Sequence, residues 1–313
     1  MIFFLLDLML LLNYMIYVLF FFISIMFLTM MERKILGLMQ IRKSVNKVGV
    51  LGVIQPFSDM LKLFFKEFFL LIYFNFFLYL FIPFFSLFIV MLMFMVLPFE
   101  NMNLIFDFSI LFMVCCLMMN TYFIILMSWS CNSKYSYLSS VRSVAQMISY
   151  EVSFFIFLLC IIILIISMSL VDFLKNQKYL WFLFILINIF FIFLLVILSE
   201  LNRIPFDFLE GESELVSGFN IEFGSGIFGL IFLVEYLNIL FFSVVLMILF
   251  MGGNFYELFM WIKLIIFMFI VLLLRGVFPR FRYDKLMMMS WKMFLPISLN
   301  MLMYLLMLDY YMC

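Results

Sequence analysis

Apolar runs of membrane-crossing length recur from one end of this chain to the other, and they restrict the fold more than any other feature. A transmembrane helix needs about 20 consecutive apolar residues. Runs near that length occupy approximately residues 2–31, 69–97, 104–128, 143–170, 179–199, 225–250, 257–274 and 287–308. Because lipid offers a backbone no hydrogen-bonding partner, such runs must be helical. The sequence therefore predicts an all-α, polytopic membrane protein with about eight transmembrane helices, forming a single domain over residues 1–313.

The composition agrees with this class and excludes several kinds of chemistry. The chain is 69% hydrophobic, whereas soluble domains are about 45–50% apolar. It has no histidine, which removes the commonest metal ligand and general base. Its five cysteines show no C-x-x-C spacing, so we expect neither a metal site nor disulfides. A formal net charge of zero gives no electrostatic argument for binding nucleic acid.

Two further features concern the compartment. The 49 phenylalanines, 30 methionines and single alanine (Ala145) indicate an AT-rich gene, as organelle genomes have, and this favours a mitochondrial origin. The first apolar run starts at residue 2 without a basic region or cleavage site, so we expect no removable signal.

The lysines and arginines predict the orientation. Most of the 18 lie in the loops after the first, third, fifth and seventh runs. The positive-inside rule places these loops on the inner side and both termini opposite. Lys175, Lys178 and Lys263 remain on the outer side, where we expect Lys263 to lie at the interface.

The first inner loop, residues 32–67, contains an amphipathic segment. Over residues 56–67, Asp59, Lys62 and Lys66 share one helical face, and phenylalanine, methionine and leucine residues occupy the other. A proline at the start suits the first turn of a helix. We predict a short helix in the interface plane. It is either a simple lead-in to the second span or a flap over a hydrophobic path.

Carboxylates concentrate in a second inner loop, residues 200–224, and within the spans. The loop holds six of the 18 acidic residues: Glu200, Asp207, Glu210, Glu212, Glu214 and Glu222. Glu151 and Glu235 lie inside apolar runs, where a carboxylate costs about 2.5–3.5 kcal/mol and usually marks an ion or proton pathway. The alternative is an inert carboxyl group bonded to a neighbouring helix, but several such groups in one bundle favour a proton relay.

A third inner loop, residues 275–286, is basic and carries Arg280 and Arg282, whose guanidinium groups suit carboxylates or polar ligand oxygens. The letters G-x-G-x-x-G occur at residues 224–229. A dinucleotide site would require a preceding strand and a soluble βαβ unit. These glycines precede a membrane span, so we interpret them as helix-packing positions.

Blocks of residues spread from 32 to 284 form a more specific pattern. They are 32–37 (E-R-K-I-L-G), 40–43, 46–49, 55–57, 141–152, 205–220 and 275–284. This pattern resembles the chain 1 family of NADH–ubiquinone oxidoreductases. The sequence departs from the family at Ser44-Val45 (usually Gly-Pro), Leu201 (usually Thr) and Phe223 (usually Tyr), and none of these changes removes a charge.

The resemblance implies a core membrane subunit of the proton-pumping respiratory complex I, with ubiquinone as substrate. Such a subunit lies in the mitochondrial inner membrane with its polar loops on the matrix side, and forms the membrane half of the quinone chamber and the path by which quinone enters. By similarity, the following carboxylates begin the proton relay: Glu151, Glu200, Glu235, Asp59, Glu210, Glu212 and Glu214. The residues implied at the chamber or as charge partners are Arg33, Glu32, Arg142, Arg203, Asp207, Phe219, Arg280 and Arg282.

The same resemblance implies that NADH, FMN and Fe–S clusters belong to partner subunits. The partners would be peripheral quinone-module subunits, small membrane subunits and lipid, without nucleic acid. Two other functions compete with this interpretation. A stand-alone secondary ion transporter would also use intramembrane carboxylates, although no internal repeat is visible. A purely structural anchor would tolerate glutamine at Glu151 and Glu235.

Overall fold

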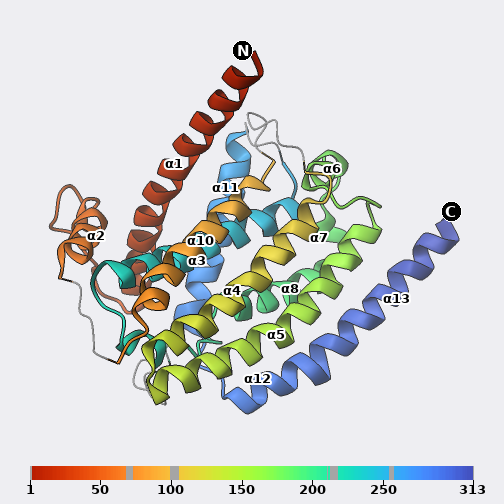
Figure 1. Ribbon diagram of the computed structural model, residues 1–313. Coiled ribbons are helices and arrows are strands. Elements are labelled where there is room, and N and C mark those ends of the chain that lie inside the picture. Colours follow the sequence, from red (N-terminus) through yellow and green to blue (C-terminus); the bar gives the residue numbers. More distant parts are fainter. Residues whose placement is uncertain are drawn as a thin grey trace.

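The computed structural model describes residues 2–67, 73–98, 106–209, 211, 218–253 and 257–312, and every regular element in these ranges is helical (Figure 1). The α-helices are α1 (Ile2–Met39), α2 (Gln55–Phe65), α3 (Phe76–Met95), α4 (Ser109–Cys131), α5 (Lys134–Ile163), α6 (Leu170–Asn176), α7 (Phe182–Ile185), α8 (Ile187–Glu200), α10 (Ser225–Phe250), α11 (Leu258–Val277), α12 (Tyr283–Met289) and α13 (Leu295–Met312). A 3-10 turn, η1 (Gly218–Ile221), precedes α10, and a π-helical turn, η2 (Ser290–Phe294), joins α12 to α13.

The all-α, polytopic membrane fold predicted from the apolar runs is confirmed. Within the described residues, seven helical segments are long and apolar enough to cross a bilayer. These are Leu12–Met39, Phe76–Met95, Ser109–Cys131, Lys134–Ile163, Ser225–Phe250, Leu258–Val277 and Tyr283–Tyr311. The amphipathic segment forms α2, with its proline in the first turn as predicted.

The run predicted at residues 179–199 differs from a single span. It is divided at Leu186 into α7 and α8, and α8 has 14 residues. At 1.5 Å per residue, α8 is about 21 Å long, shorter than the roughly 30 Å hydrocarbon layer. Much of α8 is buried against other helices, including Phe193 and Val196. An interrupted helix is tolerated at membrane depth where protein surrounds it.

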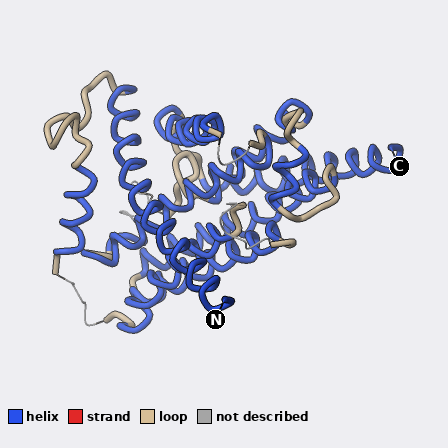
Figure 2. Tube along the Cα trace, turned by 90° about the horizontal axis from the view of Figure 1, so that it is seen from above, coloured by secondary structure: helices blue, strands red, loops and turns tan. Residues whose placement is uncertain are grey.

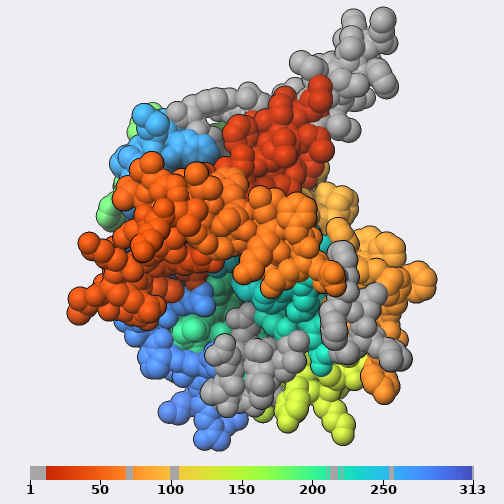
Figure 3. Space-filling view, turned by 90° about the vertical axis from the view of Figure 1, so that its left-hand side faces the viewer, coloured from red at the N-terminus to blue at the C-terminus, as the bar shows by residue number. Residues whose placement is uncertain are grey.

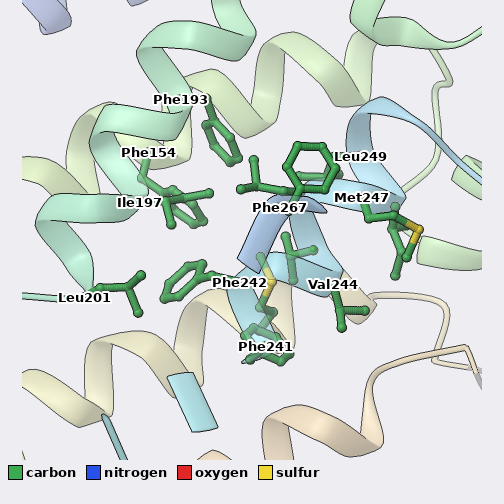
Figure 4. Close-up of a cluster of buried hydrophobic side chains, with 14 of the residues drawn as sticks. Phe154, Phe193, Ile197, Leu201, Phe241, Phe242, Val244, Met247, Leu249 and Phe267 are labelled. Carbon is green, nitrogen blue, oxygen red and sulfur yellow. The ribbon is translucent and has the colours of Figure 1, made fainter. Parts of the chain in front are cut away.

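Helix α10 lies at the centre of the bundle and contacts α1, α2, α3, α6, α7, α8 and α11. Its second half is almost entirely buried. There Phe242 packs edge-on against Phe154 of α5, which stacks on Phe193 of α8 (Figure 4). Helices α1 and α13 lie on opposite flanks (Figure 1). Only 17% of the most apolar window of each of these two helices is buried, so both flanks face lipid or another protein.

Helix α5 is rich in serine and nevertheless deeply buried. Ser139, Ser143, Ser149 and Ser153 each donate a hydroxyl hydrogen bond to the carbonyl three residues earlier, at 2.7–2.9 Å. This bonding satisfies the hydroxyl groups without a partner helix, and small side chains let neighbouring helices approach closely. The polar composition of α5 is therefore compatible with its position between α4, α8 and α13.

Lys263, near the start of α11, is buried within the protein. Its Nζ donates to the carbonyls of Met251 and Gly252, both at 3.1 Å, and lies 4.5 Å from the ring centroid of Trp181. The last carbonyls of a helix lack partners and attract a cation. The end of α10 therefore draws Lys263 inward. Nearby, the Ser169 hydroxyl and the Lys175 ammonium hold the pKa of Asp172 in α6 below its usual value.

Candidate functional site

A buried carboxylate on α1, Glu32, lies among charged groups from distant parts of the chain. Its side chain is 4% exposed, and its Oε2 accepts a hydrogen bond of 2.7 Å from the hydroxyl of Tyr236 on α10. Its Oε1 pairs with Arg275 in the last turn of α11 and lies 3.5 Å from Nη1 of Arg203, shortly after α8. A carboxylate is costly to bury unless opposite charges and donors replace its water, and both oxygens of Glu32 have such partners.

Arg203 connects Glu32 with Glu235 of α10. Its Nη2 lies 3.4 Å from Oε2 of Glu235, and its guanidinium carbon lies 4.7 Å from the ring centroid of Tyr236. The planar guanidinium can contact two carboxylates and a ring at once, which a lysine ammonium cannot do with the same fixed geometry. We call Glu32, Arg203, Glu235, Tyr236 and Arg275 the charged cluster.

The charged cluster borders a cavity of about 420 Å³ between α1, α2, α10 and α11, which we call the outer cavity. Figure 3 views the molecule from the side on which α1 and α2 cover α10. The lining is mainly apolar, from Ile25, Met26, Leu36, Pro56, Met60, Leu63, Phe228, Phe232 and Leu233. Its volume falls within the ~300–1,000 Å³ of ligand pockets, and its mixture of apolar walls and a few polar groups suits a ligand that has an apolar body and a polar head.

Asp59 and Arg33 form a separate ion pair on the wall of the outer cavity. Arg33 Nη1 lies 2.6 Å from Asp59 Oδ2, and the Gln55 side chain donates to Asp59 Oδ1 at 2.9 Å. The side chains are 50% and 35% exposed. An ion pair this accessible contributes about 0–1 kcal/mol. It therefore positions groups at the cavity more than it stabilises the fold.

A second, smaller cavity of about 80 Å³ lies between Glu235 and Glu200, the last residue of α8, and both side chains line it. We call it the inner cavity. Glu200 is buried, as is Glu151 on α5, and the two carboxyl groups are close enough to repel one another if both are charged. Oε1 of Glu200 and Oε1 of Glu151 have no hydrogen-bond partner among the described residues. The fold thus brings Glu235, Glu200 and Glu151, which were predicted from sequence as intramembrane carboxylates, into one series.

The start of the acidic loop is held against α5. Gln146, which is fully buried, donates through Nε2 to the carbonyls of Ser199 at 2.9 Å and Phe206 at 3.0 Å. Asp207 is buried and lies 3.4 Å from Nη2 of Arg280 in the basic loop. These contacts connect residues that follow α8 to residues that follow α11.

The end of the described loop is held at Gly218. Its φ is +47°, and an added Cβ would lie 2.3 Å from the Leu209 carbonyl oxygen and 2.9 Å from Cβ of Ser139. The position therefore requires glycine for both its backbone conformation and the close approach of α5.

Two further predicted site residues lie on α5 and in the basic loop. Arg142 is half-buried on α5, and Arg282 pairs with Asp284 at 2.9 Å, with both side chains largely exposed. Glu210, Glu212 and Glu214 lie outside the described residues, as does the side chain of Phe219.

Sequence reasoning missed Arg275 and Tyr236. Arg275 ends a long apolar run, which is the usual position of a cation that reaches the membrane surface, so its pairing with Glu32 was not foreseen. Tyr236 directly follows Glu235 in the sequence, and an aromatic residue in a membrane helix is common. The neighbouring sequence does not mark either residue as part of a site, because each acquires its role through contact with Glu32 on α1.

Comparisons with known proteins concern the chain as a whole. The family of NADH dehydrogenases matches residues 12–306. NADH-ubiquinone oxidoreductase chain 1 of Anopheles gambiae is 45% identical over 278 residues, covering 89% of this chain and 88% of that protein. The protein of the same name from Locusta migratoria is 46% identical over 291 residues, 93% of each chain. That from Paracentrotus lividus is 38% identical over 286 residues, covering 89% of this chain and 88% of that protein.

Proposed function

Because this chain belongs to the NADH-ubiquinone oxidoreductase chain 1 family and is a membrane subunit of that enzyme, we propose that it forms the path by which quinone enters and the first part of a carboxylate relay. The relay couples quinone reduction to proton translocation. The observation that carries this proposal is Arg203, which contacts both Glu32 at the outer cavity and Glu235 at the inner cavity.

The outer cavity is the proposed quinone path. A ubiquinone combines an apolar tail with a head that bears carbonyl oxygens. The phenylalanine, leucine and methionine side chains of α1, α2 and α10 suit the tail. The head can accept hydrogen bonds from Arg275 or Tyr236, which line the same cavity. Helix α2 forms one wall, which supports the flap over a hydrophobic path as its role rather than the simple lead-in to the second span.

The charged cluster is the proposed coupling element. Reduction places negative charge on the quinone head, and that charge competes with Glu32 and Glu235 for Arg203 and Arg275. As the contact between Arg203 and Glu235 weakens, Glu235 binds a proton more readily. The proton can then pass along the inner cavity to Glu200 and on to Glu151.

Cofactors, partners and location follow from the same family. We assign NADH, FMN and the Fe–S clusters to partner subunits. Cluster binding requires several cysteine thiolates together, and no group of three or more potential metal-binding side chains occurs in the described ranges. The exposed flanks of α1 and α13 are suited to neighbouring membrane subunits or lipid. We place the protein in the mitochondrial inner membrane, with the loops around residues 32–67, 200–224 and 275–286 on the matrix side.

The experiment that tests the relay is Glu235→Gln in the assembled complex. Gln keeps the shape of the side chain and cannot carry a proton. We expect NADH:quinone reduction and coupled proton translocation to fall by about a hundredfold or more, the lower range of what a proton-transferring group contributes. NADH:ferricyanide activity should persist, because it does not require the quinone site. The matched control is Asp284→Asn, which removes an exposed carboxylate that pairs only locally in the described chain.

Unchanged quinone reduction and proton stoichiometry in Glu235→Gln would contradict the relay and make Glu235 a packing residue. A stand-alone transporter would instead move protons without added NADH or quinone, and no specific contact favours that alternative over the family assignment.

A further inference from the structure

Half of the six polar residues that line the inner cavity are asparagines. Asn120 on α4, Asn202 just after α8 and Asn238 on α10 all line it, together with Glu200 and Glu235. The three asparagines come from elements that are distant in the sequence. Amide side chains are unfavourable in a membrane interior unless they are hydrogen-bonded, so their convergence on one cavity requires a partner.

For the amide oxygens, the described residues supply no such partner. The Oδ1 atoms of Asn120, Asn202 and Asn238 are buried there without a hydrogen-bond partner, as is Oε1 of Glu200. Asn120 is only 8% exposed. Buried polar atoms in folded proteins are almost always bonded to protein or ordered water. All four atoms are acceptors, so the missing groups are donors.

The inner cavity has room for water. Its volume of about 80 Å³ accommodates about two molecules, each of which takes up roughly 30 Å³ in the liquid. A buried water needs about 2–4 polar partners, and the amides and carboxylates on the wall provide them. Water also donates hydrogen bonds, as the four oxygens require.

We propose that Asn120, Asn202 and Asn238 hold ordered water in the inner cavity and orient it as the link between Glu235 and Glu200. This inference rests on the proposed relay. A proton that leaves the carboxyl group of Glu235 binds the first water, which releases a different proton to the next water and finally to the carboxylate of Glu200. The waters are regenerated, and no asparagine is protonated. The asparagines are therefore positioning residues.

Asn120 is the residue that best tests the inference. Asn202 has a separate reason for its identity: its φ is +48°, a conformation that asparagine tolerates, and its Nδ2 donates to Sδ of Met147 at 3.3 Å. Asn120 lies within the apolar helix α4, far from either helix end, where an amide has no capping role. Leucine has nearly the shape of asparagine, so Asn120→Leu removes the polar amide with little change in the size of the side chain.

The experiment compares Asn120→Leu, Asn120→Ser and Thr121→Val in the assembled complex. Leucine excludes the water, whereas serine restores a hydroxyl group and leaves room for it. Thr121→Val is the matched control, because Thr121 is also buried on α4 but its hydroxyl already bonds to the Met118 carbonyl. We expect Asn120→Leu to lower quinone-linked proton translocation at least about tenfold, the effect of ~1.4 kcal/mol in a barrier. We also expect a larger solvent deuterium isotope effect on turnover, because proton transfer becomes limiting. Asn120→Ser and Thr121→Val should stay near the unmodified rate.

Wild-type translocation and isotope effect in Asn120→Leu would overturn the water link. If Glu235→Gln is inactive in the same assay, the relay stands and only the water link fails; if it is active, the proposed function fails as well. Equal slowing in water and deuterium oxide would indicate structural damage and would also overturn the inference.

A direct measurement covers the case in which Asn120→Leu does not assemble. A high-resolution map of the unmodified complex should show water peaks within hydrogen-bonding distance of Asn120 and Asn238. A dry inner cavity in such a map would overturn the inference regardless of the variants.

Discussion

Replacing Gly218 by alanine tests how closely the end of the acidic loop is held against α5. The change adds one methyl group at a residue whose φ is +47°. That group would lie 2.3 Å from the Leu209 carbonyl oxygen and 2.9 Å from Cβ of Ser139. An ordinary contact between a carbon and a carbonyl oxygen is more than 1 Å longer than 2.3 Å. Either the loop or α5 must therefore move.

The size of the effect follows from two contributions. The left-handed backbone conformation costs a residue other than glycine about 1–2 kcal/mol. Forcing an extra carbon into a filled site typically costs about 1–3 kcal/mol more. The total of roughly 2–5 kcal/mol is a large fraction of the about 5–15 kcal/mol by which a typical domain is stable. We therefore expect the loop to shift away from α5 rather than to accept the methyl group in place.

The assay is thermal inactivation of NADH:quinone reductase activity in membranes that contain the assembled complex. Gly218→Ala should inactivate several degrees below the unmodified complex and should reduce quinone more slowly, with NADH:ferricyanide activity retained. The matched control is Gly211→Ala in the same loop, where the nearest described atom to an added Cβ is Arg280 Nη1 at an ordinary 3.7 Å. If the two variants behave alike, the close contact assigned to Gly218 is not real and the reasoning fails.

Two further substitutions separate buried contacts from exposed ones. Gln146→Glu removes the donor shared by the Ser199 and Phe206 carbonyls. Each buried group left without a partner costs about 1–3 kcal/mol, so thermal inactivation of quinone reductase should occur at a lower temperature. An unchanged midpoint would show that the two hydrogen bonds from Gln146 do not stabilise the complex. Asp59→Asn breaks an ion pair that is about half exposed, so the loss of stability should stay below about 1 kcal/mol. A large drop in the same midpoint would mean that Asp59 is far better shielded from solvent in the assembled complex.

The sequence predicts the fold well where lipid leaves the backbone a single option. The apolar runs that became α3, α4, α10 and α11 had to be helical, because nothing in a bilayer bonds to an open backbone. Apolarity alone does not distinguish a helix that faces lipid from one that faces protein. For that reason the break at Leu186 and the shortness of α8 could not be predicted: α8 is apolar because it is buried in the bundle.

The candidate site, like the fold, could be predicted from the sequence only in part. Glu151 and Glu235 stand out in sequence because a carboxylate inside an apolar run is costly, and both lie in the proposed relay. Their partners are a property of the fold. Arg275 contacts Glu32 across 243 positions of sequence, and Asn120 matters only because α4 brings it to the cavity that Glu200 and Glu235 share. No spacing or motif carries such information.

The central position of α10 has a consequence for how the molecule is made. Helices α1, α2, α3, α6, α7 and α8 all contact α10, yet all precede it in the chain, and the tube view shows how the helices gather into one bundle (Figure 2). During synthesis at about 5–20 residues per second, the early helices must wait in the membrane for seconds to tens of seconds before their common neighbour is inserted. Assembly factors that shield newly inserted helices would therefore be needed most while α3 to α8 are present without α10.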